Sequence, residues 1–246
     1  MMSRANRWLE ALLALVYPSV CQICGAGRAV AREGYVCDAC RCRPDGVRFI
    51  LPPFCERCGL PVEGAVTTAY ECGNCRDMQL DFSQARAVVV ATGLVMEVIH
   101  RYKYNRALWF EPFLAELLCR KAAPEIAGTF DAIVPVPLHP LKAREREFNQ
   151  AERLATTLGR ASGLPVLRRA VRRVRFTATQ TAFNRGERQR NMRGAFAVAT
   201  GEPLVGRRLV VVDDVLTTGA TTSACARALR KAGATEVAVW TVARGL

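Results

Sequence analysis

Residues 207–222 read Arg207-Arg208-Leu209-Val210-Val211-Val212-Asp213-Asp214-Val215-Leu216-Thr217-Thr218-Gly219-Ala220-Thr221-Thr222, and this segment gives the clearest indication of the fold. Its apolar part, residues 209–212, is short and rich in branched side chains, which is typical of a central parallel strand buried on both faces. Residues 223–231 are predicted to form the helix that follows. Open α/β sheets bind ligands at the carboxyl ends of their strands, so Asp213 and Asp214 are the first candidate site residues.

A hydroxyl-rich turn separates the acids from the helix. Its residues are Thr217, Thr218, Gly219, Ala220 and Thr221. Gly219 permits a tight turn, and the free N–H groups and the helix dipole favour an anion there. A simple capped and solvated turn is the alternative, but a cap needs one acid, not an adjacent pair followed by hydroxyls. The sequence therefore predicts a ribose 5-phosphate site, with the phosphate on the turn and the ribose hydroxyls on the carboxylates.

The composition is that of a globular protein with a strongly basic surface. The chain has 246 residues, 50% of them hydrophobic, and a formal net charge of +13. Most of the basic residues are arginine, whose planar guanidinium suits phosphate. Phosphorylated ligands or nucleic acid are therefore the expected partners, with a generally Arg-rich proteome as the other explanation.

The amino-terminal segment, residues 1–18, is predicted to form a short amphipathic helix. No apolar run in the chain approaches the roughly 20 residues of a membrane span. Glu10 interrupts the apolar run of this segment, and no small-residue cleavage site follows it, so it does not have the form of a secretory signal. These features predict a cytoplasmic protein.

Residues 19–82 form a cysteine-rich region that predicts metal binding. Eight cysteines make four Cys-x-x-Cys pairs: Cys21/Cys24, Cys37/Cys40, Cys55/Cys58 and Cys72/Cys75. Two such pairs complete a four-thiolate zinc site, and a shift of 34 or 35 residues superposes the first two pairs on the last two. This repeat favours two tandem zinc ribbons with one structural zinc each. An interleaved pairing remains open, as does replacement of Cys40 by Cys42.

From residue 84 to residue 246 the pattern predicts an α/β domain, with a mostly parallel sheet flanked by helices. Strands are expected at 85–91 and 130–134, helices at 93–104 and 108–121, and a proline-rich loop at 135–140. A basic run follows this loop and leads into a helix that ends near residue 161. Lys142, Arg144 and Arg146 in this run, and Lys103 on the first helix, are predicted to lie near the ligand edge of the sheet.

Several motifs in this chain resemble those of known families. The apolar run, acidic pair and Thr-Thr-Gly-Ala-Thr resemble the phosphoribosyl pyrophosphate (PRPP) motif of type I phosphoribosyltransferases. The chain as a whole is similar to the ComF family. This resemblance rests on the same motif together with the Val136-Pro137 loop, the Phe148-Asn149-Gln150 run and the cysteine-rich module. Members of that family are phosphoribosyltransferase-like proteins, some of them tied to the uptake of transforming DNA.

This resemblance implies a type I phosphoribosyltransferase fold that binds PRPP with Mg²⁺. It implies that Lys142, Arg144 and Arg146 lie near the diphosphate. It also implies a mobile segment over the site with the residues Gln180, Thr181, Arg185, Arg188 and Asn191. Glu147 stands where the family usually has glycine, and a carboxylate that pointed inward there would crowd or repel a diphosphate.

The stretch 168–175 is rich in arginine and predicts a strand or edge ribbon with one basic face. Such a face suits the phosphate backbone of single-stranded or non-specific DNA, although a solvated basic face is the simpler interpretation. Two functions stay open from the sequence. One is phosphoribosyl transfer to an unidentified nitrogen acceptor; the other is a non-catalytic protein that binds PRPP and DNA during competence. The zinc ribbons offer a further surface for a protein partner.

Overall fold

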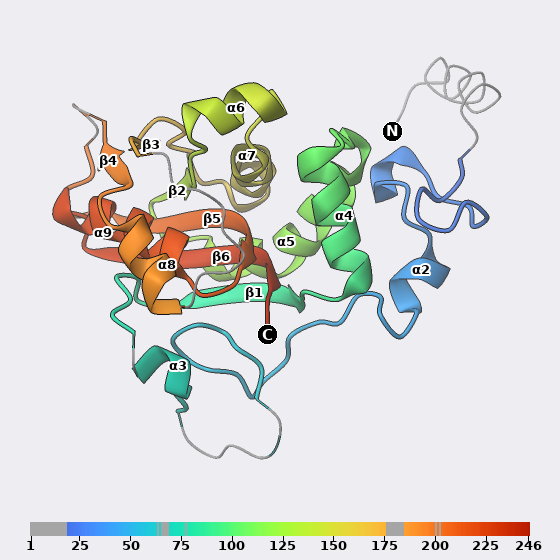
Figure 1. Ribbon diagram of the computed structural model, residues 1–246, viewed down its shortest axis with the longest axis horizontal. Helices are drawn as coiled ribbons and strands as arrows, with labels where there is room; N and C mark the ends of the chain where they lie inside the picture. Colours follow the sequence, from blue (N-terminus) through green and yellow to red (C-terminus); the bar gives the residue numbers. More distant parts are fainter. Residues whose placement is uncertain are drawn as a thin grey trace.

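The computed structural model describes residues 19–62, 64, 69–76, 78–175, 185–199, 201 and 203–246. The helix predicted within residues 1–18, and Gln180 and Thr181 of the predicted mobile segment, lie outside these residues. Figure 1 shows a central sheet with helices around it and the cysteine-rich segments at two separate places, α2 (Asp38–Cys42) beyond α4 and α3 (Gly73–Arg76) below β1.

The centre of the fold is a parallel four-stranded sheet in the order β1-β6-β5-β2. The strands are β1 (Ala85–Val90), β2 (Ala132–Pro135), β5 (Arg208–Leu216) and β6 (Glu236–Arg244). The predicted α/β class is therefore confirmed. β6 has no counterpart among the predicted strands, and β5 continues four residues beyond the predicted end at Val212 because β6 pairs with it as far as Leu216 and Arg244.

The sheet is buried on both faces because its side chains alternate between two hydrophobic cores. Val210 and Val212 belong to the core with α4 (Gly93–Tyr104), α5 (Glu111–Ile126) and α7 (Gln150–Ser162). Leu209 and Val211 belong to the core with α9 (Ala220–Lys231). The bounds predicted for α4 are confirmed, whereas α9 begins three residues earlier than predicted, so Ala220 and Thr221 lie on its first turn.

The basic run after β2 folds into α6 (Pro140–Arg146), which begins directly at Pro140. Pro is favoured in the first turn of a helix because it needs no N–H partner there. The helix ends at Glu147, whose backbone adopts the left-handed conformation with φ of 66°. Asn149 then caps α7, since its side chain accepts a hydrogen bond from Ala151 N at 3.1 Å.

The arginine-rich stretch forms one strand of a small antiparallel ribbon. In this ribbon β3 (Val171–Arg173) pairs with β4 (Phe196–Val198), and α8 (Arg185–Met192) precedes β4. Within β3, Val171 is buried and Arg172 is exposed, as the predicted alternation requires. Val174, which the same alternation would bury, lies beyond the end of the strand and is 56% exposed. Short helical turns complete the described elements: η1 (Ala31–Glu33) and η2 (Leu108–Phe110). Among the described residues, no helix combines the length and apolarity that crossing a membrane requires.

Candidate functional site

The two acids lie beside each other at the ligand edge of the sheet. Pairing of β2 with β5 stops at Val212, so Asp213 and Asp214 begin where the neighbouring strand has ended. Asp214 is buried, with 2% of its surface exposed, and Asp213 is half-buried. Asp213 Oδ1 accepts a hydrogen bond from Asp214 N at 2.9 Å. The pair therefore lies just beyond the carboxyl end of β2, on the strand β5 that continues past it.

Side chains from two other elements converge on Asp214. Lys103, in the last turn of α4, forms an ion pair with the Asp214 carboxylate. Gln150, the first residue of α7, donates from Nε2 to Asp214 Oδ1 at 3.4 Å. Arg146 donates in turn to Gln150 Oε1 at 3.1 Å, and its guanidinium lies 4.8 Å from the ring centroid of Tyr104. The structure thus brings three predicted residues, Lys103, Arg146 and Asp214, into one buried network.

Gln150 and Tyr104 were not among the predicted site residues. Gln150 is 5% exposed, which is unusual for an amide and is explained by its two hydrogen bonds to charged partners. The sequence feature that points to Gln150 is its position at the end of the Phe148-Asn149-Gln150 run. No sequence signal set Tyr104 apart from other helical aromatics.

The surroundings of the two acids shift their pKa values in opposite directions. Burial raises the pKa of Asp213 well above its usual value, and the neighbouring Asp214 charge adds to this effect. Burial also opposes ionisation of Asp214, but the Lys103 ammonium outweighs it and holds the pKa of Asp214 below its usual value. For Lys103, the two carboxylates outweigh burial and raise its pKa. The site therefore favours one fixed carboxylate and a second acid that can hold a proton.

The predicted phosphate-binding residues lie on one turn. Gly219 has φ of 77° and precedes the first residue of α9, so its left-handed conformation is one that glycine adopts without strain. Thr218 Oγ1 accepts a hydrogen bond from Ala220 N at 3.4 Å. Thr217 is exposed, and Thr218 and Thr221 are half-buried. Thr222, by contrast, donates to Gly219 O at 3.1 Å and is buried.

The remaining predicted cations lie on α6 and α8. Lys142 is half-buried, and burial together with the charges of Arg146 and Arg173 lowers its pKa. Arg144 is exposed on the same helix. Arg185 and Arg188 belong to α8, as does the half-buried Asn191. Among these cations, Lys142 is close enough to Arg146 for the charge of Arg146 to affect its pKa, and Arg146 belongs to the hydrogen-bond network of the acid pair.

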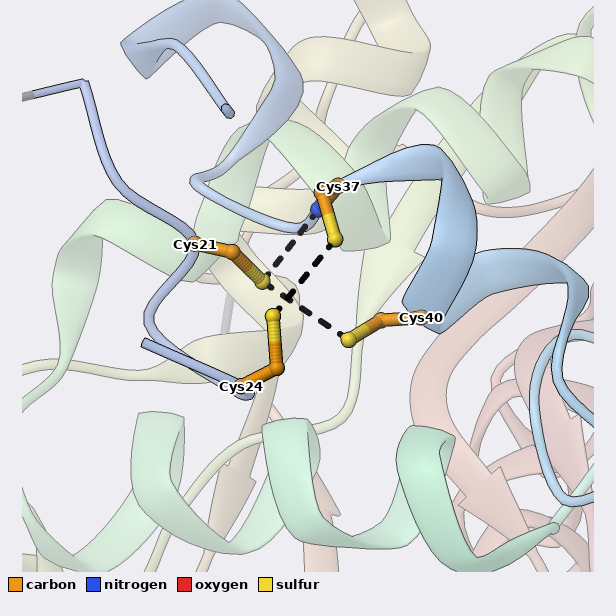
Figure 2. Close-up of side chains that lie close together, drawn as sticks. All are labelled: Cys21, Cys24, Cys37 and Cys40. Carbon is orange, nitrogen blue, oxygen red and sulfur yellow. Dashed lines mark hydrogen bonds between the residues drawn. The ribbon is translucent and has the colours of Figure 1, made fainter. Parts of the chain in front are cut away.

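Two cysteine tetrads are assembled in tandem, as the internal repeat predicts. Figure 2 shows the first, in which Cys21, Cys24, Cys37 and Cys40 point toward one centre. The second consists of Cys55, Cys58, Cys72 and Cys75, and in each tetrad all sulfur atoms lie within 4.8 Å of one another. The interleaved pairing is therefore wrong. Cys42 is exposed and outside the first tetrad, so Cys40 holds the fourth position.

The tetrads have the geometry that zinc requires. A tetrahedral ion with Zn–S bonds of about 2.3 Å places its sulfur ligands about 3.8 Å apart. The Cys21–Cys40 and Cys24–Cys37 sulfur separations are both 3.8 Å. In the second tetrad the corresponding separations are 3.8 Å and 3.7 Å. Backbone amides also donate to the sulfurs, for example Cys37 N to Cys21 Sγ at 3.3 Å, which favours the thiolate form.

The fold and these centres define a class: a double zinc ribbon joined to a phosphoribosyltransferase-type α/β domain. Residues 12–76 match the family model of the double zinc ribbon domain, and residues 160–246 match that of the phosphoribosyl transferase domain. The chain is 31% identical to competence protein F of Haemophilus influenzae over 91% of this chain and 96% of that protein. It belongs to the ComF family.

Other relatives agree with this assignment. The DNA utilization protein YhgH of Salmonella typhimurium is 32% identical over 94% of this chain and its whole length. Competence protein ComFC of Bacillus subtilis is 25% identical over 85% of this chain and 84% of its own. The solved structure of glutamine PRPP amidotransferase from B. subtilis with ADP and GMP overlaps 51% of this chain and 24% of that chain, with 24% identity and a TM-score of 0.34. That overlap is too loose to add to the family assignment.

Proposed function

We propose that this protein binds PRPP, with Mg²⁺, at the Asp213-Asp214 pair and the turn that follows it. The observation that supports this most directly is the order of features along one segment. The Asp213-Asp214 pair, in which the buried Asp214 is ion-paired with Lys103, is followed by a hydroxyl-rich turn and then by the amino terminus of the 12-residue helix α9. This order suits a ribose 5-phosphate, because the acids accept hydrogen bonds from ribose hydroxyls and the helix amides attract the phosphate.

Each group of residues has a role in this proposal. Residues 217–221 bind the 5-phosphate, and Asp213 and Asp214 bind the ribose hydroxyls. Lys142, Arg144 and Arg146 bind the diphosphate. Mg²⁺ takes oxygen ligands and substrate phosphates, so a carboxylate pair beside a diphosphate fits it, and when bound it neutralises the charge of the leaving diphosphate.

The reaction class that this arrangement serves is phosphoribosyl transfer to a nitrogen acceptor. The bond from ribose C1 to the diphosphate oxygen breaks and its electron pair leaves with the diphosphate. The acceptor nitrogen forms the new bond to C1 and loses a proton. In this proposal the carboxylate of Asp214 stabilises the positive charge that develops on the ribose, and the cations of α6 stabilise the departing diphosphate.

Isothermal titration calorimetry with PRPP and Mg²⁺ tests the binding site. The double variant Asp213→Asn/Asp214→Asn is expected to weaken binding at least about tenfold, because each lost carboxylate removes a charge-assisted hydrogen bond. The matched control is Asp131→Asn, since Asp131 accepts from Arg208 N at the opposite end of β5. Unchanged affinity in the double variant would contradict the site assignment. Release of diphosphate with a candidate acceptor distinguishes a transferase from a protein that only binds PRPP.

A second candidate function is binding of single-stranded DNA. An open groove lies between Pro137 and Pro140, just before the proposed diphosphate-binding residues of α6, and the strand β3 on its other side. Its lining includes four arginines: Arg168, Arg169, Arg172 and Arg173. Guanidinium groups in a groove suit a phosphate backbone without reading its sequence. The relatives named for competence and DNA utilization support this candidate.

A further inference from the structure

One guanidinium contacts both the second cysteine tetrad and the proposed phosphate turn. Arg244, the last residue of β6, is 5% exposed. On the turn side it donates from Nη1 to Leu216 O at 3.1 Å and to Thr217 O at 2.7 Å. On the tetrad side it donates from Nε to Cys58 O at 3.2 Å and from Nη2 to Cys58 Sγ at 3.5 Å. Arg244 therefore fixes the start of the turn relative to a zinc ligand.

Apolar residues that follow the second tetrad support the turn from behind. A small cavity is lined on one side by Cys58, Leu80 and Phe82 and on the other by the turn residues Thr217 and Gly219. A Cβ atom added to Gly219 would lie 3.5 Å from the ring of Phe82, which is van der Waals contact. The ribbon thus forms the wall on which the turn rests.

The linker after the second tetrad also holds the first turns of α9. Asp81 accepts hydrogen bonds from Ser223 Oγ at 3.0 Å and from Arg227 Nε at 2.9 Å. Arg57, between the first two cysteines of this tetrad, donates to Leu80 O at 2.7 Å. These bonds connect the knuckle of the second ribbon to the helix whose amino terminus is proposed to bind phosphate.

The first tetrad makes its contacts on the other face of the sheet. Its buried cysteines belong to the core of α4 and α5, whereas those of the second belong to the core of α9. Arg41, next to Cys40, pairs with Glu116 of α5 at 2.9 Å and lies over the Phe113 ring. Arg101 of α4 donates to Gln22 O at 2.8 Å. The two ribbons therefore support different elements of the α/β domain.

We propose that Arg244 is a positioning residue that couples zinc in the second tetrad, and not in the first, to binding of the 5-phosphate. This inference rests on the proposed function. A zinc knuckle loses its fold without metal. Loss of zinc from the second tetrad frees Cys58. It removes the two bonds that Arg244 donates to Cys58, and it releases the apolar residues behind Gly219. Because coupling between two sites is reciprocal, a bound phosphoribosyl ligand must equally retain this zinc.

Zinc release from the wild-type protein tests the coupling without any variant. The protein is mixed with a chromogenic zinc chelator, with and without saturating ribose 5-phosphate, and the release of each zinc ion is followed in time. We expect the ligand to slow one of the two ions by about fivefold or more, which is the lower end of measured couplings between sites. Cys72→Ser, which disrupts the second tetrad, should abolish the protected phase, and Cys37→Ser should retain it. Equal rates with and without ligand would overturn the coupling.

Arg244→Met tests the positioning residue itself. We expect it to weaken ribose 5-phosphate binding at least about tenfold, because a buried fork of hydrogen bonds is lost. The zinc content should stay at two, and the protection of zinc by ligand should disappear. Arg86→Met is the matched control, since Arg86 of β1 also donates to the second ribbon, at Glu56 O over 2.7 Å, and not to the turn. Its affinity for ribose 5-phosphate should match the wild type.

The outcomes separate this inference from the function on which it rests. A wild-type protein that binds neither ribose 5-phosphate nor PRPP overturns the proposed function and the coupling with it. A wild-type protein that binds, but whose zinc release is unchanged by ligand and whose Arg244→Met variant retains full affinity, overturns the coupling alone.

Discussion

Glu147 Oε1 lies 3.0 Å from Arg106 Nη2, and both side chains are more than half exposed. The carboxylate thus faces solvent and a cation that follows α4, instead of the loop interior. Where the ComF family usually has glycine, the backbone of this chain keeps a left-handed conformation, with φ of 66°. Glu147 therefore has a strained backbone conformation. Its carboxylate points toward Arg106 and not toward the proposed diphosphate position, so it does not have the inward orientation that would crowd a diphosphate.

Replacement of Glu147 by glycine is expected to stabilise the protein by about 1 kcal/mol, because glycine adopts the left-handed region without the cost that a Cβ imposes. The exposed ion pair with Arg106 contributes less than this. Urea denaturation measures the change. Glu147→Gln is the control, since it loses the pair and keeps the strain. A large gain in PRPP affinity in Glu147→Gly would show that the carboxylate opposes the ligand after all.

Substitution of Lys103 by methionine is expected to destabilise the protein by about 3–5 kcal/mol at neutral pH, because it leaves the buried Asp214 charge without its partner. The sign of the pH dependence follows from the pKa of Asp214. In the wild type this pKa is depressed, so the contribution of Asp214 is present above about pH 4 and is lost at lower pH. In the variant the Lys103 charge no longer offsets burial, so the pKa of Asp214 rises and the variant recovers stability as pH falls.

The difference between Lys103→Met and the wild type should therefore widen from pH 5 to pH 8, as measured by denaturation at both values. Lys121→Met is the control, because Lys121 is exposed and pairs with Glu125 at 3.5 Å on the surface of α5. Its effect should stay below about 0.5 kcal/mol. A pH-independent loss in Lys103→Met would mean that packing, and not charge, sets the cost.

Protein purified without chelators is expected to contain close to two zinc ions per chain, measured by elemental analysis. Cys40→Ser should lower the count to about one, because its sulfur belongs to the first tetrad. Cys42→Ser should leave it at two, because Cys42 is exposed and outside the tetrad. A count of zero in the wild type, or loss of zinc in Cys42→Ser, would contradict the tandem ribbons.

The arginine groove predicts a salt-dependent affinity for single-stranded DNA. Arg169 and Arg172 are exposed in its lining. Their joint replacement by alanine should weaken binding and reduce the slope of log affinity against log salt by about 1.4, since each phosphate contact contributes about 0.7 on single strands. Fluorescence anisotropy with a labelled oligonucleotide measures both. The control Lys121→Ala/Arg160→Ala removes the same number of positive charges from α5 and α7, and it should leave the salt slope unchanged. If it reduced the slope as much as the groove variant does, binding would depend on net charge alone.

The parts of this protein that depend on neighbours along the chain can be predicted from its sequence. The segment from Leu209 to the first turns of α9 carries its strand, turn and helix signals within a short span, and the repeat of the cysteine pairs favours one tetrad in each half of the cysteine-rich region. Both follow from local geometry, since a buried strand needs an apolar run and a zinc knuckle needs two nearby thiols. The central strand β6 contains such a run too, from Val237 to Trp240, although it is absent from the predicted strands.

Which distant residues meet depends on the tertiary structure. Sheet order places β6 beside β5, and this brings Arg244 between Cys58 and Thr217. Packing of α4 and α7 against the sheet brings Lys103 and Gln150 to Asp214. Such contacts arise from the burial of whole faces, which no local pattern encodes. The internal repeat predicts two similar zinc ribbons for the same reason, since it is a local pattern. The fold shows that the two ribbons differ in their contacts: the first supports α4 and α5, and the second supports the turn next to the acid pair.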